Sequence, residues 1–193
     1  MHGPPRIVGL GGALGTSSSS FLALKVALAG AEEAGAETVA YDVRALALPM
    51  YEWGSPPPAA ATALAEAMHR ADGLIWSSPL YHGSVSGVFK NAIDWLELLA
   101  EHEPPYLTDK PVGLIGTSGG AQSMQSINTL DFIVRALRGW VVPFSVPLVT
   151  AGKAFEADGS PVEARVGSQL RMLGAEVARA ARLFRAAART DPR

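Results

Sequence analysis

Short apolar runs alternate with helix-length amphipathic segments along this 193-residue chain. The first run, residues 7–10, is too short for a helix and is bounded by glycines, as expected of a buried strand. Strands joined by a helix lie parallel, because the crossover must be about one helix long. The alternation predicts a doubly wound α/β fold with helices on both faces of a mostly parallel sheet. The predicted strands are residues 7–10, 38–43, 73–77, 112–115 and 140–149.

The segments between these runs carry apolar residues at helical spacing. Residues 49–58 hold four prolines and are expected to form an irregular connection. Pro143 and Pro147 place the last strand at a sheet edge, because proline cannot donate a ladder hydrogen bond. The arginines of the final helix favour a solvated face over a nucleic-acid contact. The predicted helices start near Phe21, Ala59, Val85, Ile127 and Val166.

The composition fits one globular domain over residues 1–193, with 48% hydrophobic and 18% charged residues. A net charge of −2 gives no general attraction to nucleic acid or anionic lipid, so a small-molecule partner is expected. The chain has no cysteine, which excludes thiol chemistry and means that redox activity needs a bound cofactor. Without a secretory signal or an apolar run of about 18 residues, a cytoplasmic protein is expected, with no membrane partner.

Ligands of doubly wound sheets bind beyond the carboxyl ends of the strands. The loop after the first strand, residues 11–20, is rich in glycine and serine and opens directly into a helix. Its amides, with the hydroxyls of Thr16, Ser18 and Ser20, suit a phosphate at the positive end of the helix dipole. The spacing fits neither the Walker pattern nor the dinucleotide fingerprint, so a monophosphate is favoured. A simple helix cap is an equal alternative for the loop considered alone.

Two further loops follow the third and fourth strands. Residues 77–87 combine a proline, an aromatic side chain and two glycines, which could form a rigid rim for a planar ligand. Residues 116–122 contain adjacent glycines that let backbone amides approach a ring carbonyl. Ordinary turns, with Tyr81 in the core, are the alternative for both loops.

The stretch Ser-Pro-Leu-Tyr-His-Gly-Ser-Val-Ser-Gly-Val-Phe-Lys-Asn-Ala-Ile-Asp-Trp-Leu, residues 78–96, resembles the signature of the NADPH-dependent FMN reductase family. That signature reads Pro-x-Tyr-Asn-Gly-Ser followed by Gly-x-x-Lys-Asn-x-x-Asp. The resemblance implies a three-layer flavodoxin-like fold with five parallel strands in the order 2-1-3-4-5. It also implies FMN as cofactor, NADPH or NADH as hydride donor, ping-pong transfer through flavin N5 to flavin, quinone or another small acceptor, and a homodimer or homotetramer.

By the same resemblance, the cofactor-binding residues fall in the three loops, and the hydride is carried by the flavin rather than by a catalytic side chain. No metal site is implied. The predicted FMN-binding residues are Gly12, Ala13, Leu14, Ser18, Ser19, Ser20, Pro79, Leu80, Tyr81, His82, Gly83, Thr117, Ser118, Gly119 and Gly120.

Three positions depart from the family pattern. Ala13 stands where the family has serine, Gly15 where it has arginine, and His82 where it has asparagine. Loss of the arginine removes a charge-assisted contact to phosphate worth roughly 1.5 to 3 kcal/mol. Looser binding of FMN, or use of FMN as a substrate, is the expected consequence.

Two rival functions remain open at this stage. A flavodoxin-type electron carrier would bind FMN without efficient oxidation of NAD(P)H, although carriers tend to be strongly acidic. A flavin-free hydrolase or binding domain would use the first loop for another phosphate. Lys90 and Asp94, one helical turn apart, are expected to pair. Trp95, Leu98 and Leu99 suit either a subunit contact or the core.

Overall fold

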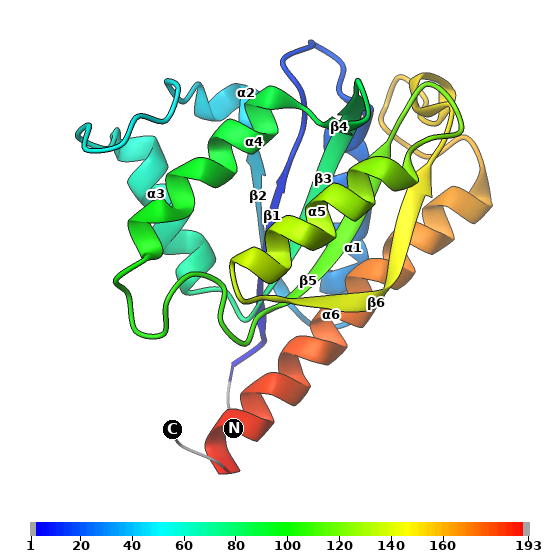
Figure 1. The fold of residues 1–193 in the computed structure, drawn as a ribbon. Helices are drawn as coiled ribbons and strands as arrows, with labels where there is room; N and C mark the ends of the chain where they lie inside the picture. The colour runs from blue at the N-terminus through cyan, green and yellow to red at the C-terminus, as the bar shows by residue number, and fades with distance from the viewer. Residues whose placement is uncertain (1–2, 191–193) are drawn as a thin grey trace.

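The computed structural model describes residues 3–190 and has a parallel five-stranded sheet at its centre (Figure 1). The strand order is β2-β1-β3-β5-β6, which confirms the predicted flavodoxin-like order of the five parallel strands. A further two-residue strand, β4 (Ser84–Val85), pairs antiparallel with the end of β3 and was not predicted. The parallel strands are β1 (Arg6–Gly11), β2 (Glu37–Asp42), β3 (Gly73–Tyr81), β5 (Pro111–Thr117) and β6 (Trp140–Leu148).

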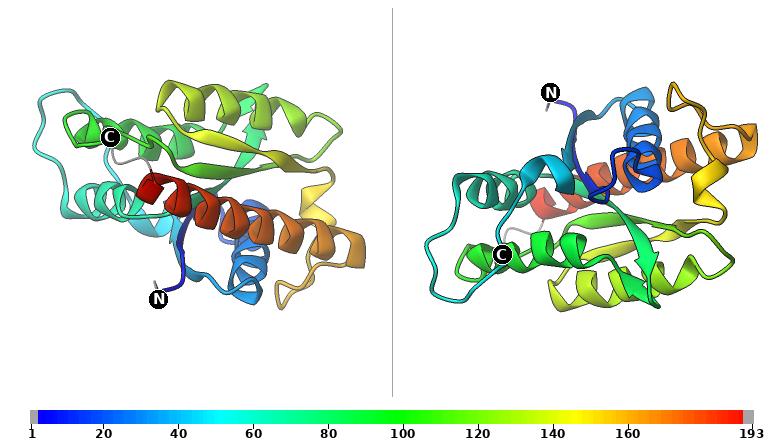
Figure 2. Two further views of the ribbon diagram at one scale, coloured as in Figure 1. Left: turned by 90° about the horizontal axis from the view of Figure 1, so that it is seen from below. Right: turned by 90° about the horizontal axis from the view of Figure 1, so that it is seen from above.

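Helices cover both faces of the sheet and complete the three layers (Figure 2). Helices α1 and α6 pack on one face, and α3, α4 and α5 pack on the other. The helices are α1 (Ser19–Glu33), α2 (Val43–Leu46), α3 (Ala59–His69), α4 (Gly87–Asp94), η1 (Trp95–Leu99), α5 (Met124–Ala136), η2 (Ala151–Lys153) and α6 (Ala164–Thr190).

The α1–α6 face is built from small residues. A Cβ atom on Gly174 would lie 1.8 Å from the carbonyl oxygen of Ala27, and one on Gly30 would lie 2.2 Å from that of Arg171. On the strands beneath, Gly9 and Gly113 leave room for leucine and valine side chains of the same two helices. The two helix backbones therefore meet each other directly, and α1 is held close to the sheet.

The opposite face is filled by large side chains. Trp76 on β3 and Phe89 on α4 are fully buried, and their rings meet edge to face with centroids 6.1 Å apart. Met68 of α3 and Leu99 of η1 are fully buried in the same cluster. The indole nitrogen of Trp76 has no hydrogen-bond partner among the described residues.

The third strand is longer than the sequence indicated. It continues past Ser77 to Tyr81, so that Pro79 pairs in register with Thr117 of β5. On the other side, β1 ends at Gly11, opposite Ser77. The missing N–H of the proline therefore breaks no hydrogen bond to β1, which explains why proline is tolerated in this central strand.

The predicted edge position of the last strand is confirmed, since β6 ends the sheet. Its pairing with β5 shifts register between Val112 and Leu114, where Pro143 interrupts the ladder. Among the helices of residues 3–190, none is long and apolar enough to cross a membrane.

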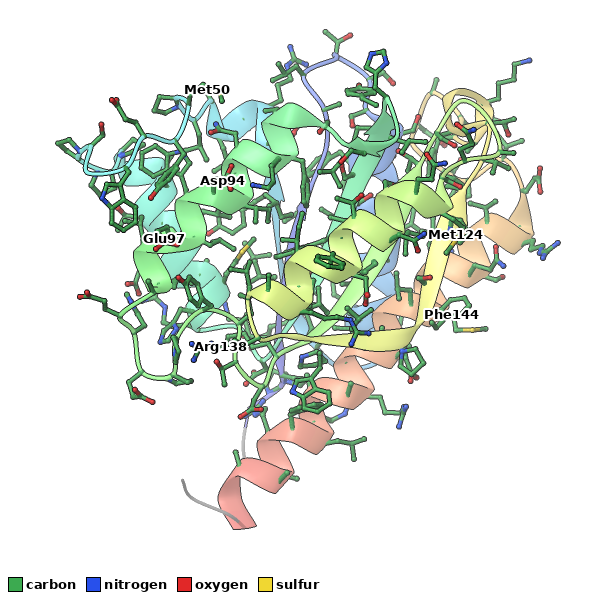
Figure 3. All side chains as sticks on the ribbon, in the orientation of Figure 1. Met50, Asp94, Glu97, Met124, Arg138 and Phe144 are labelled. Carbon is green, nitrogen blue, oxygen red and sulfur yellow. The ribbon has the colours of Figure 1, made fainter. Side chains whose placement is uncertain are left out.

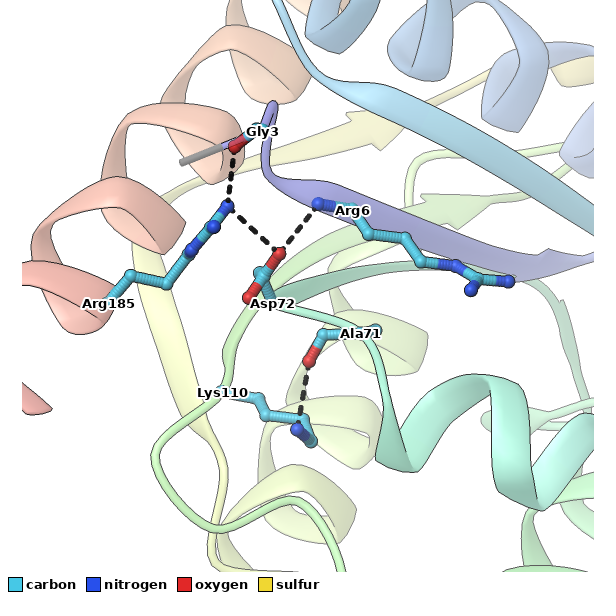
Figure 4. Close-up of polar contacts among 6 residues, drawn as sticks. All are labelled: Gly3, Arg6, Ala71, Asp72, Lys110 and Arg185. Carbon is cyan, nitrogen blue, oxygen red and sulfur yellow. Dashed lines mark hydrogen bonds and ion pairs between the residues drawn. The ribbon is translucent and has the colours of Figure 1, made fainter. Parts of the chain in front are cut away.

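The amino-terminal end of the sheet is closed by a polar cluster around Asp72 (Figure 4). One carboxylate oxygen of Asp72 accepts a hydrogen bond from the Arg6 amide at 2.8 Å and pairs with Arg185 at 3.3 Å. Lys110 donates to the carbonyl of Ala71 at 2.9 Å. Burial lowers the pKa of this lysine, with Asp72 acting in the opposite direction.

The arginines of α6 serve the fold of this chain. Arg171 pairs with Glu33 of α1 at 3.1 Å, and Arg182 donates to the carbonyl of Ala34 at 3.0 Å. Together with the pair between Arg185 and Asp72, these contacts tie the helix to the rest of the domain. The side chain of Arg189 lies outside the described residues.

Candidate functional site

A pocket opens at the carboxyl edge of the sheet, where the loops after β1, β3 and β5 meet. Its volume is about 180 Å³, and it is open to solvent on one side. One end is lined by serine residues at the start of α1, and the other by the end of β3 and the loop after β5. The lining residues are Ala13, Ser17, Ser18, Ser19, Ser20, Pro79, Leu80, Tyr81, Thr117, Ser118, Gly119 and Ala151.

The serine end of the pocket is organised by the helix cap. The Ser18 hydroxyl oxygen accepts from the Phe21 amide at 3.3 Å and lies 3.0 Å from the Ser20 hydroxyl oxygen. The first hydrogen bond of α1 runs from the Leu22 amide to the Ser18 carbonyl. The amides of Ser19 and Ser20 precede it and therefore have no acceptor within the helix. Ser77 of β3 donates to the Ser20 carbonyl at 2.8 Å and fixes this end of α1 on the sheet.

The second wall is a hairpin rather than a loop leading directly into a helix. β3 and β4 are joined through His82 and Gly83, both of which have positive φ, 50° and 84°. Histidine and asparagine are both among the residues that tolerate this left-handed region, so either side chain is compatible with the backbone observed at His82. Tyr81 is 53% exposed and lines the pocket, which rejects the core alternative for this residue.

The third wall is held by the end of β6. The Ser118 amide donates to the carbonyl of Leu148 at 3.0 Å, and the Ala151 amide donates to that of Ser118 at 2.9 Å. These bonds bring Ala151, the first residue of η2, into the pocket lining. A Cβ atom on Gly119 or Gly120 would meet nothing within 4 Å, so both glycines face open space.

Most of the predicted FMN-binding residues are brought together in this pocket. The predicted residues outside the lining are Gly12, Leu14, His82, Gly83 and Gly120. Leu14 is 66% exposed, while His82 and Gly83 form the hairpin tip next to Tyr81. Gly12 has φ of 114° and lies against the Asp42 carboxylate, where a Cβ would come within 2.6 Å. Its role is to let the backbone turn beside β2.

Two lining residues were missed. Ser17 directly precedes the helix cap, and its position in the serine run was a sufficient signal. Ala151 carried no signal, because it reaches the pocket only through the hydrogen bonds between Ser118 and the end of β6.

The donor set of the pocket fits FMN. Serine hydroxyls and the first amides of α1 can hold a phosphate, helped by the helix dipole. Pro79 and Leu80 form an edge opposite Thr117 and Gly119, where a flat ring can lie against backbone groups. No group of three or more His, Cys, Asp or Glu side chains within residues 3–190 is placed to hold a metal ion.

The Lys-Asn-x-x-Asp part of the sequence signature has a structural role. Asn91 is buried, accepts from the Tyr51 amide at 2.8 Å and donates to the Pro49 carbonyl at 2.9 Å. The Trp95 indole donates to the same carbonyl at 3.1 Å. These bonds anchor the irregular connection after β2, where Met50 is labelled in Figure 3. Lys90 and Asp94 form the predicted ion pair.

The sequence predicts solvated surface positions for His69 and His102, because their spacing does not suit a metal site. In the structure their two rings contact each other. His69 and His102 meet edge to face with ring centroids 4.7 Å apart, and His102 lies 3.4 Å from Glu66. Burial lowers the pKa of His69, and Lys110 and His102 lower it further. The pair lies near the amino-terminal end of the sheet, away from the pocket, and His2 lies outside the described residues.

Comparison with known proteins also points to a protein that uses FMN. The family model of NADPH-dependent FMN reductase matches residues 5–153. An FMN-dependent NADPH-azoreductase of Staphylococcus aureus strain USA300 is 43% identical over 97 residues, which cover 50% of this chain and 48% of that protein. This chain therefore aligns with about half the length of the curated relatives it matches.

Solved structures share the fold. FerB, a flavoenzyme NAD(P)H:(acceptor) oxidoreductase from Paracoccus denitrificans, superposes with a TM-score of 0.70 at 22% identity, covering 93% of this chain and 98% of that one. The apo form of an NADH:FMN oxidoreductase (EMOB) gives 0.60 at 23% identity, covering 95% of this chain and 89% of that one. With the family match across β1 to η2, the chain belongs to the NADPH-dependent FMN reductase family.

Proposed function

We propose that this chain is an FMN-dependent NAD(P)H oxidoreductase of the flavin reductase type. The observation that carries the proposal is the pocket itself, in which a serine-rich helix start and two glycine-containing loops meet at the switch point of a flavodoxin-like sheet. Bound FMN would accept a hydride from reduced nicotinamide at N5 and pass the electrons on to a second acceptor, in a ping-pong order. The supporting relatives include azoreductases that depend on the same cofactor.

The residues of this chain have positioning roles in the proposed activity. The hydroxyls of Ser18 and Ser20 and the first amides of α1 bind the phosphate. The hairpin residues Pro79 to Gly83 support one edge of the ring. Residues 117–120 lie at its pyrimidine end, where the amides of Gly119 and Gly120 can donate, since the Ser118 amide is bonded to Leu148. In this proposal the redox chemistry is supplied by the cofactor, and no side chain carries the hydride.

The acceptor in this proposal is a small molecule that reaches the open side of the pocket. Free flavin, a quinone, an azo compound or a metal oxyanion all satisfy this description, and adding each to the reduced protein ranks them. We also propose that residues 1–193 form one FMN-binding domain, because the described helices pack on a single sheet. The cytoplasmic location remains a prediction.

Anaerobic mixing of the FMN-loaded protein with NADPH, and separately with NADH, tests the activity. We expect rapid bleaching of the flavin absorbance with at least one donor. Persistent yellow colour with both donors would reject the reductase and favour the electron carrier. Purified protein that fails to bind added FMN would instead favour the flavin-free alternative.

We further propose that the chain forms a homo-oligomer, and that its contact differs from the one suggested by the sequence. Trp95 and Leu99 are buried inside the chain, 2% and 0% exposed, so they are not available to a partner, and Leu98 is half-buried. Phe132 of α5 is 79% exposed beside a groove of about 610 Å³ that contains Val85 and Ile133. A two-fold contact would place this side chain of one copy against the groove of the other.

Light scattering tests this contact. The wild-type protein is expected at the mass of a dimer or tetramer, and Phe132→Glu at a lower mass. A monomeric wild-type protein would reject the oligomer, and an unchanged mass of the variant would reject this surface.

A further inference from the structure

The phosphate end of the pocket lacks the cation that the family places there. No lysine or arginine occurs between Arg6 and Lys25, so residues 12–20 can offer a phosphate only hydroxyls, amides and the helix dipole. Arg6 starts β1 at the opposite end of the sheet, and its amide belongs to the Asp72 cluster. A doubly charged phosphate is bound more strongly where a cation is also within reach.

One lysine lies next to the pocket from a different part of the chain. Lys153 is the only lysine or arginine within two positions of a residue that lines the pocket. It is the last residue of the 3-10 turn η2, whose first residue, Ala151, is 7% exposed and belongs to the lining. The side chain of Lys153 is exposed and forms no ion pair within residues 3–190.

The turn that carries Lys153 is tied to the loop after β5 and also lies against α1. Thr150, in the left-handed region with φ of 49°, redirects the chain after β6, and the Ala151 amide is bonded to the Ser118 carbonyl at 2.9 Å. η2 also contacts α1, the helix that begins with the pocket serines. The four-carbon stem of lysine gives the ammonium group a wide reach from this base.

The other cations near this edge of the sheet are less well placed. Lys25 lies over the Phe21 ring, 5.9 Å from its centroid, nearly two turns beyond the start of α1. Arg44 follows β2, which lies across β1 from the strands that line the pocket. Arg165 is exposed in the first turn of α6 and does not line the pocket.

We propose that Lys153 supplies the positive charge for the FMN phosphate, in place of the arginine that Gly15 replaces. This inference rests on the proposed function, because it requires FMN in the pocket. Two segments that are distant in the sequence, the loop after β1 and the turn after β6, then both contact the phosphate of the cofactor. Binding is also expected to discriminate FMN from riboflavin through a side chain that lies outside the phosphate loop.

Equilibrium titration by flavin fluorescence tests the proposal with FMN and riboflavin as the two probes. Lys153→Met is expected to weaken FMN binding about tenfold, the effect of one charge-assisted hydrogen bond, and to leave riboflavin binding unchanged. Lys25→Met is the matched control and should leave both affinities unchanged. Raising the salt concentration should weaken FMN binding by the wild type more than by Lys153→Met.

A gain-of-function variant sharpens the test. A Cβ atom on Gly15 would have only the Ser17 carbonyl oxygen within 4 Å, at 3.8 Å, so Gly15→Arg can be accommodated. This variant should tighten FMN binding and restore it in the Lys153→Met background. Unchanged FMN affinity in Lys153→Met, or an equal loss for riboflavin, would overturn the role of Lys153. A wild-type protein that binds neither flavin would overturn the proposed function, and the inference with it.

Discussion

The two faces of the central sheet are packed in opposite ways. On the α1–α6 face, glycines and alanines let two helix backbones touch, as at Gly174 and Ala27. On the α3–α4–α5 face, the space between sheet and helices is filled by large side chains such as Trp76 and Phe89. The first face fixes backbone positions directly, whereas the second fixes them through side chains.

The difference bears on the site, because α1 carries the pocket serines at its first residues. A helix seated backbone to backbone on α6 cannot shift without a steric clash, so the amides proposed to bind the phosphate are held in place. The pocket wall formed by β3 and β4 is instead supported by the side-chain core through Ser78, whose hydroxyl accepts from the Ser86 amide at 3.2 Å. Substitutions that enlarge a side chain should therefore destabilise the α1–α6 face. Substitutions that shrink a side chain should destabilise the α3–α4–α5 face.

Shrinking the large core is expected to give the largest loss of stability. Phe89→Ala removes a fully buried ring and its contact with Trp76, and should lower the free energy of unfolding by about 3–5 kcal/mol. Phe132→Ala is the matched control, since that ring is 79% exposed, and it should change stability by less than about 0.5 kcal/mol in the monomer. Urea denaturation measures both. Equal losses would contradict the contrast between core and surface.

Enlarging the small-residue face should come next in size. Gly174→Ala places a methyl group 1.8 Å from a backbone oxygen and should cost about 1–3 kcal/mol or more, although alanine favours a helix by about 1 kcal/mol. FMN affinity should fall with it, because α1 is displaced. The control is Gly87→Ala, at the start of α4, where a Cβ meets nothing within 4 Å. A stabilised Gly174→Ala would show that the helices are not in backbone contact.

Weakening the connection of residues 49–58, which is anchored on the α3–α4–α5 face, should give a smaller and more local loss of stability. Asn91→Leu removes the bonds to the Tyr51 amide and the Pro49 carbonyl and should cost about 1–3 kcal/mol. Hydrogen exchange should accelerate first over residues 49–58, while the amides of α1 keep their protection. Uniform acceleration across the chain would mean that Asn91 supports the whole core and not this connection.

The pair of His69 and His102 predicts that the stability of the fold depends on pH. The pKa of His69 is lowered in the folded state, chiefly by burial, so the unfolded state binds more protons between that pKa and its ordinary value near 6.5. Stability should therefore fall as the pH drops through this window, and His69→Gln should reduce the fall. Thermal unfolding between pH 5 and pH 7.5 measures the difference. Identical profiles for the two proteins would remove His69 as the cause.

Hydrophobic periodicity predicted the parallel sheet, and the resemblance to the family supplied the order of its strands. The sequence also placed the three loops at one edge, since parallel strands end there together. It could not predict that β3 extends through Pro79, because that depends on where β1 ends. Ala151 was hidden as well, since it reaches the pocket through hydrogen bonds between Ser118 and the end of β6. For Trp95 the sequence left the core and a subunit contact open, because an apolar helix position does not show what covers it, and the structure places this residue in the core.

A crystal structure of the protein grown with FMN is the most direct test of the central claim, that the carboxyl-edge pocket holds this cofactor. The account predicts phosphate oxygens about 3 Å from the Ser18 and Ser20 hydroxyls and the first amides of α1, with the ring along residues 79–83. Density for FMN at another surface, or a phosphate turned away from these serines, would contradict it.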